Sequence, residues 1–513
     1  MKYQTMFARV SIILLAAASQ MLVAAELPAR IHYSVRDYGA TGDGKTLDSP
    51  AINKTIEAAA AAGGGTVLVP AGTYLSGSIR MKSNIHLKID VGATILGAPQ
   101  SMNAYDETEE FPGIAYQDGG HTYFRNSLIW GENLTNVFIT GLGTIHGGGL
   151  TKDSGILDEM CGYDDFLKPR TKTYPPVRLG NKAIALKLCR NVLIRDVTLV
   201  HGGHFAILAT GCDNMTLDNL TIDTNRDGID IDCCRNTTVS NCRINAPGDD
   251  GLCIKSTCAL GRPVITENLT ITNCQVTGFK EGTLLDGTLQ PDRWGQGRLK
   301  FGTEASGGFR NCTISNCTFR NCWGLALEEV DGGIMENITI NNLTMMDIAR
   351  YPIYITTGKR NRTPDRESVS RMRNILISDV IITGASRTSG IHIAGLEEQP
   401  LEGLRLQNIR IVYEGGGTKE QANLIPKELG RGYPEPTEVM PAYGLFARHV
   451  KGLELANITF SSLKDDFRPA IQCVNVKGLE IDNLKAQLAD GVAASKFENV
   501  PDPVIRNSPI LQR

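Results

Sequence analysis

The sequence lacks an excess of charge of either sign. Its 52 lysines and arginines against 55 aspartates and glutamates leave a net charge of −3, and only 6% of its 513 residues are aromatic. Proteins that bind nucleic acids or anionic membranes ordinarily present a basic surface to the phosphates. We therefore expect neither nucleic acid nor an anionic membrane surface among the partners of this chain.

Long hydrophobic runs are also missing. One apolar stretch, residues 10–18, follows Lys2 and Arg9 near the N-terminus. It is too short to cross a bilayer, which takes about 20 residues, but it has the pattern of a secretory signal. We predict a signal peptide over residues 1–25, a single domain over 26–513, export to the periplasm or the medium, and no membrane span.

The 13 cysteines include no Cys-x-x-Cys pair and no Cys/His spacing typical of a zinc site. We therefore expect no metal and no cofactor. Four cysteines occupy strand positions that suit a small buried apolar side chain: Cys242, Cys274, Cys312 and Cys317. Two pairs remain open as disulfide candidates: Cys233 with Cys234, and Cys253 with Cys258.

Glycine is abundant, with 54 residues, and one sequence pattern recurs: an asparagine followed by alternating β-branched residues. Three copies begin at Asn191, Asn214 and Asn236, spaced by 23 and 22 residues. The pattern returns at Asn268, Asn311, Asn337 and Asn374. Short β-branched runs at this period predict an all-β protein, a parallel solenoid whose coils bury their apolar sides by stacking. We interpret the recurring Asn-x-Thr triplets as turns followed by strands, in preference to glycosylation sites.

Residues 48–62 are predicted to form a helix that begins near Pro50 and ends at three consecutive glycines. It would cover the open end of the solenoid, where unpaired strand edges otherwise recruit other chains. Residues 278–297 and 414–443 are rich in glycine and proline. We expect them to be long inserted loops, which often form the walls of a functional site.

Three aspartates lie where two adjacent repeats begin a strand. Asp227 and Asp250 each stand two residues before an alternating apolar pair, and Asp249 precedes the second. Coiling at this period would bring the three carboxylates together, and their repulsion would raise the pKa of one of them. A protonated and an ionised carboxyl group are what glycosidic bond hydrolysis requires. A calcium site is the physical alternative, because clustered oxygens also suit that ion.

Strand alternation predicts which side chains on the same coils face outward. The first outward column contains Asp230, Cys253, Lys300 and Ala326. The second contains Asp232, Lys255, Gly302 and Glu328. Neighbours in a column lie one strand spacing apart, about 4.8 Å. We therefore expect Asp232 and Lys255 to form an ion pair at the surface.

From residue 35 to about residue 490 the chain resembles the polygalacturonase family of glycoside hydrolases, family 28. The Asn-Thr-Asp motif of that family is similar to residues 225–227, and its paired aspartates are similar to Asp249 and Asp250. The resemblance implies a right-handed parallel β-helix that hydrolyses pectin with inversion. It further implies that Asp250 is the general acid and that Asp227 and Asp249 hold the attacking water.

Two motifs of that family are missing. Its Gly-His-Gly histidine would fall at Gly297, and its Arg-Ile-Lys motif, which binds a galacturonate carboxylate beside the scissile bond, would fall at residues 326–328. Glu328 would repel a uronate there. The departures favour an enzyme that removes end residues from pectic oligosaccharides or acts on rhamnogalacturonan. Separately, we expect the protein to be a monomer. The side chains expected to bind substrate are Asn225, His204, Lys255, Arg298, Lys300, Glu328 and Arg360.

Two other functions remain open. A pectate-lyase-like enzyme would use the aspartates to bind Ca²⁺ and a basic residue to abstract a proton. A non-catalytic solenoid would bind carbohydrate without turnover.

Overall fold

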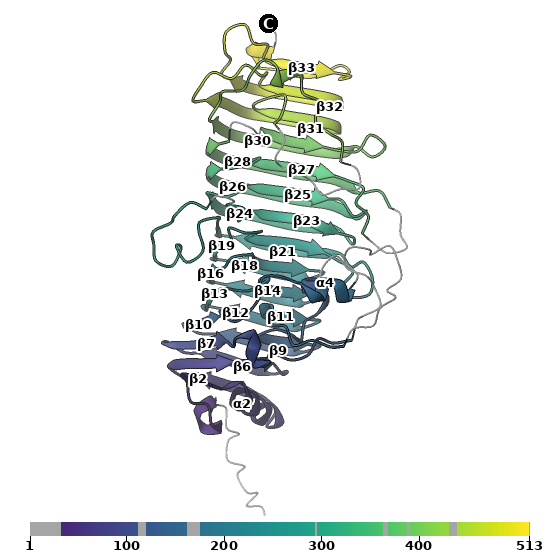
Figure 1. Ribbon diagram of the computed structural model, residues 1–513. Helices are drawn as coiled ribbons and strands as arrows, with labels where there is room; N and C mark the ends of the chain where they lie inside the picture. The colour runs from purple at the N-terminus through teal and green to yellow at the C-terminus, as the bar shows by residue number, and fades with distance from the viewer. Residues whose placement is uncertain are drawn as a thin grey trace, which may run out of the picture.

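A computed structural model describes residues 32–110, 119–161, 175–292, 295–362, 368–386, 390–429 and 439–511. Parallel strands follow one another as the coils of a continuous stack, from β1 (His32–Ser34) to β34 (Val504–Arg506), as Figure 1 shows. The all-β parallel β-helix predicted from the repeats is confirmed. The predicted signal peptide lies outside the described residues. No helix within the described ranges is long and apolar enough to cross a membrane.

Each coil contributes strands to three parallel ladders. The first ladder contains β5 (Ile79–Arg80), β8 (Ile129–Glu132), β11 (Lys182–Lys187), β14 (Phe205–Thr210), β17 (Asp227–Asp232), β20 (Leu252–Ser256), β23 (Leu299–Ala305), β25 (Leu325–Glu329), β27 (Ile353–Thr357), β29 (Ile391–Ala394) and β33 (Ser495–Glu498). We call it the first sheet. The second contains β1, β3 (Gly65–Val69), β6 (Ile85–Ile89), β9 (Thr135–Thr140), β12 (Arg190–Arg195), β15 (Asp213–Asp218), β18 (Arg235–Ser240) and β21 (Thr266–Thr272). The third contains β2 (Asp43–Leu47), β4 (Gly72–Ser76), β7 (Ala93–Gly97), β10 (Thr144–His146), β13 (Thr198–Val200), β16 (Thr221–Asp223), β19 (Arg243–Asn245) and β22 (Gln275–Thr277).

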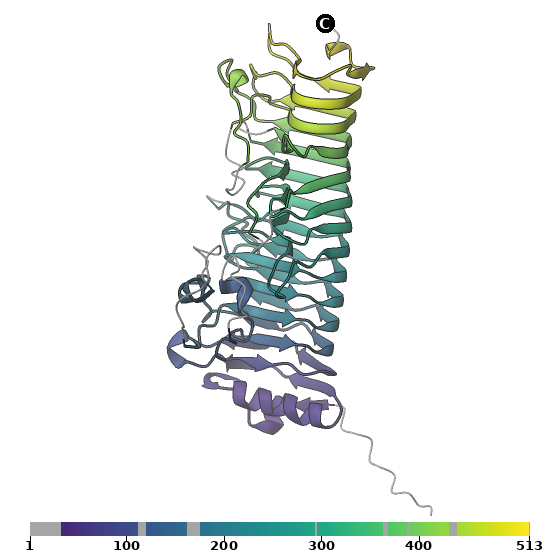
Figure 2. The same cartoon turned by 90° about the vertical axis from the view of Figure 1, so that its right-hand side faces the viewer.

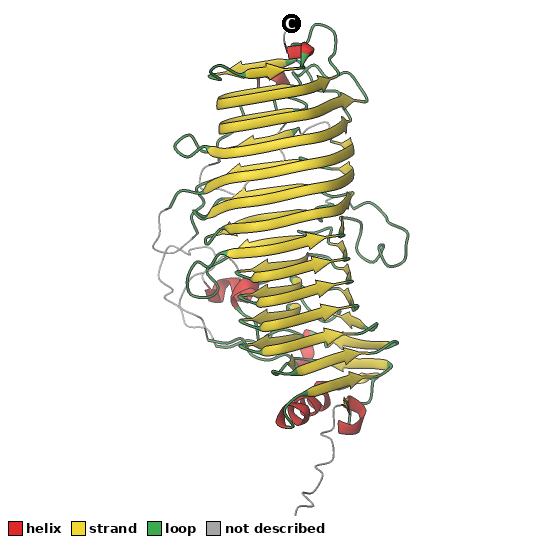
Figure 3. Ribbon diagram, turned by 180° about the vertical axis from the view of Figure 1, so that it is seen from behind, coloured by secondary structure: helices red, strands yellow, loops and turns green. Residues whose placement is uncertain are grey.

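Towards the C-terminus the second and third ladders merge into long strands, which Figure 3 shows from behind. They are β24 (Phe309–Arg320), β26 (Ile334–Ile348), β28 (Arg371–Ala385), β30 (Leu401–Tyr413), β31 (Leu445–Ser462) and β32 (Ile471–Ala486). The strands β31 and β32 also continue the first sheet. The predicted loops at 278–297 and 414–443 project between β22 and β23 and between β30 and β31.

The recurring asparagines turn the chain into the strands of the second ladder. Asn191, Asn214 and Asn236 have φ values of 56°, 54° and 53°, in the left-handed region that asparagine tolerates. Their side chains also stack from coil to coil: Asn214 Nδ2 donates to Asn191 Oδ1 at 3.3 Å, and Asn191 Nδ2 donates to Asn136 at 3.0 Å. The interpretation of these residues as structural turns is confirmed.

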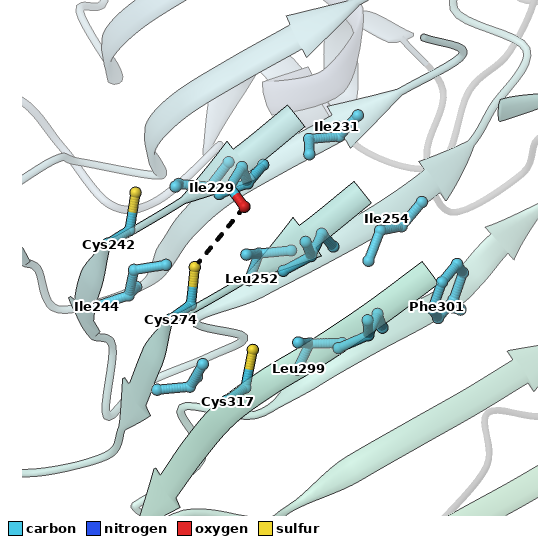
Figure 4. Packing of buried hydrophobic residues seen from close by; sticks show 14 of the residues in the cluster. Ile229, Ile231, Cys242, Ile244, Leu252, Ile254, Cys274, Leu299, Phe301 and Cys317 are labelled. Carbon is cyan, nitrogen blue, oxygen red and sulfur yellow. Dashed lines mark hydrogen bonds between the residues drawn. The ribbon is translucent and has the colours of Figure 1, made fainter. Parts of the chain in front are cut away.

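The interior of the stack is apolar. Ile229, Leu252 and Leu299 lie in register on consecutive coils and point inward, beside a column of cysteines that includes Cys274 (Figure 4). The cysteines expected to be small core residues are buried. Cys233 carries a free, buried thiol, so the candidate disulfide with Cys234 is not formed. Cys253 also carries a free thiol, so the second candidate disulfide, with Cys258, is not formed either.

The predicted capping helix is α2 (Ser49–Ala61), which lies at the base of the stack in Figure 2. Pro50 stands in its first turn, and Ile52, Ile56 and Ala59 join the core cluster under the first coil. The remaining helical segments are short: η1 (Val35–Tyr38), η2 (Gln100–Met102), α3 (Gly119–Thr122), α4 (Ile156–Cys161), η4 (Gln421–Asn423) and η5 (Pro509–Leu511).

Candidate active site

The three aspartates meet at one corner of two consecutive coils. Asp227 is the first residue of β17, and Asp250 stands two residues before β20. The Gly228 amide donates to the Asp250 carbonyl at 3.0 Å, which joins the two corners. A side chain at Gly228 would place Cβ 2.3 Å from the Gly251 carbonyl oxygen, so the close approach requires glycine. One carboxylate oxygen of each of Asp227, Asp249 and Asp250 lies within 4.8 Å of the others, as the repeat spacing predicted.

Asp250 is buried between two cations. Arg298 Nε donates to its Oδ1 at 2.6 Å, and Lys300 forms an ion pair with its Oδ2. Burial alone would raise the pKa of Asp250, but the charges of Arg298 and Lys300 outweigh it and hold this pKa well below its ordinary value. Asp250 is therefore an ionised carboxylate in the free protein.

Asp227 and Asp249 form a second, less neutralised pair. Asp227 is buried, and desolvation together with the charge of Asp249 raises its pKa well above the ordinary value. Asp249 is more accessible, with 27% of its side chain exposed. Arg226 Nε lies 3.3 Å from its Oδ2, and Gln296 Nε2 donates to its Oδ1 at 2.8 Å. Asp227 is therefore the carboxyl group of this corner that favours the protonated form.

Lys255 belongs to a buried charge cluster on the first sheet. Its Nζ lies 2.7 Å from Asp230 and 3.3 Å from Glu304, and it lies 2.8 Å from His121 Nε2. The expected surface ion pair with Asp232 is wrong. Asp232 is buried and accepts two hydrogen bonds from Thr257 and one from Thr210, which satisfy its carboxylate. Lys255 reaches diagonally to Asp230, a contact within range on neighbouring strands.

The outward columns also require one correction. Asp230, Cys253, Lys300 and Ala326 stand in register, as expected. In the second column Asp232 pairs with Lys255, but the register then shifts between Ile254 and Ser256. Lys255 therefore does not oppose Gly302. Between these two pairs β23 has more residues than β20, an irregularity that strict alternation in the sequence does not predict.

Arg298 continues the site toward Glu328. Its Nη1 donates to Glu328 Oε1 at 3.1 Å, and its guanidinium carbon lies 5.5 Å from the ring centre of Trp323. Glu328 is 1% exposed, and burial raises its pKa above the ordinary value despite Arg298 and Lys300. Arg298 and Lys300, which were both predicted to bind substrate, thus lie in the site and are paired with acids of the protein itself.

His204 and Asn225 flank the aspartates. His204 is buried, with Nδ1 3.1 Å from Ser154 Oγ and in contact with Arg226. Asn225 is half-buried and its Oδ1 has no hydrogen-bond partner within the described part of the chain. Both lie at the corner where the sequence placed them.

Arg360 lies elsewhere. Its guanidinium group is buried against Asp331, with Nε 2.9 Å from that carboxylate, and it also donates to Thr303 Oγ1 at 2.9 Å. It reaches the site through Glu304, 3.4 Å away, which Arg360 and Lys255 share. Arg360 orders the loop after β27 in this structure.

Sequence reasoning missed several residues at this corner. Gln296 also approaches Asp250 Oδ1, at 3.3 Å, and so bridges both neighbouring aspartates. Its only signal was its position beside Gly297, where a family histidine is missing. Arg226 lies inside the Asn-Arg-Asp motif and contacts Asp249, a contact that the sequence analysis did not predict. Glu304 and His121 carried no local pattern.

Chain segments cover the outward face of the first sheet on both sides of the aspartates. On the N-terminal side, Phe124 packs on Phe205 and Leu208, next to α3 and α4. On the C-terminal side, Met440 packs with Tyr354 and other residues of β25 to β31. The three aspartates on β17 and before β20 thus lie between these two packed groups.

The chain is similar to known proteins over much of its length. Residues 32–149 match the family model described as rhamnogalacturonase A/epimerase, pectate lyase-like, and residues 177–289 match the one for a right-handed β-helix region. The chain is 25% identical over 428 residues to an exopolygalacturonase of Platanus acerifolia, covering 78% of this chain and 96% of the relative. It is 24% identical over 399 residues to a probable polygalacturonase of Vitis vinifera, covering 74% of each.

These comparisons support the assignment of the chain to the polygalacturonase family of glycoside hydrolases. The crystal structure of a hyperthermoactive exopolygalacturonase from Thermotoga maritima has the same fold, with a TM-score of 0.61 and 21% identity over 85% of this chain and 93% of that one. Gln296 and Arg298 occupy the space around Asp250 in this chain, which lacks the histidine and the Arg-Ile-Lys motif that the resemblance led us to expect at Gly297 and at residues 326–328.

Proposed function

We propose that this polygalacturonase-family protein is an exported hydrolase that removes sugar units from the ends of pectic chains with inversion at the anomeric carbon. The observation that carries the proposal is the convergence of Asp227, Asp249 and Asp250 at one corner of the first sheet. A hydrogen-bonded water lies about 2.8 Å from each oxygen it contacts, so oxygens within 4.8 Å of each other can hold one water between them.

The charges of the site support a division of roles that differs from the one expected from the sequence. Asp250, held ionised by Arg298 and Lys300, is suited to orient the water and accept its proton. Asp227, whose pKa is raised, favours its protonated form and lies beside Asp249, the more exposed of the two. The pair would protonate the glycosidic oxygen as the C1–O bond breaks, while water adds to C1 from the opposite face.

The packed residues on the first sheet support exo action. An enzyme that cleaves within a polymer needs an open groove on both sides of the bond. Here Phe124 and Met440 lie over the first sheet on either side of the aspartates. The test is to follow pectin viscosity and released sugar together. Release of small sugars with little loss of viscosity is expected, whereas an early fall in viscosity would contradict exo action.

The acid role can be tested with leaving groups. Asp249→Asn should lose about 10²–10⁴-fold in kcat on natural oligosaccharides. On an aryl glycoside whose phenol departs without protonation, the loss should be much smaller. Asp250→Asn should lose activity equally on both substrates, because water activation is needed for each. An Asp250→Asn variant rescued by the better leaving group would instead return the acid role to Asp250.

A Ca²⁺-dependent lyase is the second candidate, because three clustered carboxylates suit that ion. Arg298 and Lys300 already neutralise Asp250, which disfavours a further cation at that carboxylate. Activity in EDTA that yields saturated sugars would exclude the lyase. Unsaturated uronates that vanish with chelator would establish it.

A further inference from the structure

A line of partly exposed side chains runs along the corner of the solenoid, beginning at the candidate catalytic aspartates. Asp249, Gln296 and Arg350 each stand three residues before the first-sheet strand of their own coil. Trp323 stands two residues before β25, and its amide donates to the Gln296 carbonyl at 2.8 Å. All four are half-buried, whereas every residue of β23, β25 and β27 is buried. Accessible surface therefore follows the corner and leaves the covered sheet aside.

Arg350, at the far end of this line, has a donor that the protein leaves unsatisfied. Its guanidinium carbon lies 5.2 Å from the ring centre of Trp323, a contact that holds the group without using its N–H donors. Its Nε is buried and has no hydrogen-bond partner in the described part of the chain. Because the side chain as a whole is half-buried, a ligand at the surface can reach the guanidinium edge. A ligand that supplies the acceptor recovers the cost of the unmade hydrogen bond.

A second guanidinium group contacts the same ring but is already neutralised. Arg298 lies 5.5 Å from the ring centre of Trp323, and it donates to Asp250 and Glu328. It stands on the coil before Trp323, and Arg350 stands on the coil after it. Trp323 thus separates an arginine that serves the candidate catalytic carboxylate from one whose donor is open to a ligand.

A carboxylate is the ligand that this arrangement suits. An ionised carboxylate only accepts hydrogen bonds, and a guanidinium group can donate two parallel N–H bonds to it. Three coils separate Arg350 from Asp249, which is about 14 Å at a strand spacing of about 4.8 Å. A carboxylate bound there belongs to a unit of the substrate that is well removed from the bond at the aspartates.

We infer that Arg350, held by Trp323, binds the carboxylate of a uronate unit several units away from the cleaved bond. The substrate chain then leaves the aspartates along the corner, over Gln296 and Trp323, toward the C-terminal end of the solenoid. The inference rests on the proposed function and gives its substrate a direction and a length. An end unit is removed at the aspartates, while a more distant uronate anchors the rest of the chain at Arg350.

The test measures kcat/KM for oligogalacturonates and rhamnogalacturonan fragments of increasing length. Wild-type kcat/KM should rise at the length that reaches Arg350. Arg350→Gln should lose about tenfold or more on the longer fragments and match the wild type on the shortest fragment that is cleaved. Arg350→Lys, which keeps the charge without the planar fork, should recover part of the rise. The matched control is Arg405→Gln on β30, which removes an exposed ion pair with Glu454 and should match the wild type at every length.

Circular dichroism checks that each variant folds. If Arg350→Gln does not fold, Arg350→Lys decides the question, because it should still show a smaller rise than the wild type. A wild type without a rise, a rise that the Arg350 variants retain in full, or an equal loss at every length would overturn the inference and leave the proposed function standing. Failure of the wild type to cleave a pectic fragment of any length would overturn the proposed function, and the inference with it.

Discussion

Arg298 Nε lies 2.6 Å from Asp250 Oδ1, so the candidate catalytic carboxylate is neutralised by the coil that follows it. With Lys300 on its other oxygen, Asp250 stays ionised although it is buried. This contact distinguishes Asp250 from Asp227, which has the same place on the preceding coil but a raised pKa. With these cations beside one of them, two carboxyl groups in equivalent positions have pKa values shifted in opposite directions.

Removing one of these cations should change the pH dependence of the enzyme. In Lys300→Gln the pKa of Asp250 rises, so a larger fraction of this carboxyl group is protonated in acid. The acidic limb of the kcat/KM profile should move to higher pH, with the greatest loss of activity at low pH. Lys88→Gln, which alters an exposed ion pair with Asp90, is the control. An acidic limb that stays in place would show that Asp250 is not the group that must be ionised.

The basic limb should report the Asp227–Asp249 pair. Activity is expected to fall as pH rises through the raised pKa of Asp227, because the acid then loses its proton. In Asp249→Asn this limb should move to lower pH, because the charge of Asp249 no longer raises the pKa of Asp227 while desolvation still does. Measuring kcat/KM against pH for both enzymes checks this. A basic limb that persists unchanged in the variant would contradict the assignment.

Asp227→Asn should abolish activity yet stabilise the fold at neutral pH. A folded-state pKa raised above the unfolded value of about 3.9 favours the folded state below that value, and this stability is lost as pH rises through the folded pKa. Asparagine does not titrate, so the variant has no such loss of stability as pH rises. Thermal unfolding followed by circular dichroism should therefore give a variant whose Tm advantage over wild type grows with pH. A Tm difference that is independent of pH would contradict the buried, raised carboxyl group.

Much of the fold was predictable from the sequence because its signals are local and repeated. The asparagines at left-handed turns set the coil length, and alternation placed Ile229 and Leu252 inside. The same periodicity brought Asp227 and Asp250 together. Each of these inferences depends on spacing along the chain, which the sequence displays directly.

The finer electrostatics were not predictable because they depend on side-chain reach and on inserted loops. Lys255 extends to Asp230 instead of the directly opposed Asp232, whose oxygens are taken by hydroxyl and amide donors. Gln296 enters the site from a loop of irregular structure. Arg298 was predicted to bind substrate, but the protein's own acids hold it.

The predicted export signal can be tested independently. When the full chain is expressed in a bacterial host, mass spectrometry of the periplasmic or secreted protein should show an N-terminus close to Glu26. Replacing the apolar stretch 10–18 with polar residues should retain the protein in the cytoplasm. An intact Met1 on exported protein would rule out cleavage at the predicted site.

The anomeric form of the first product tests the central claim most directly. Proton NMR during the first minutes of hydrolysis, in EDTA, distinguishes the possible chemistries. The account predicts a saturated sugar released with inverted configuration, and none from Asp250→Asn. A retained configuration, an unsaturated uronate, or undiminished release by that variant would contradict it.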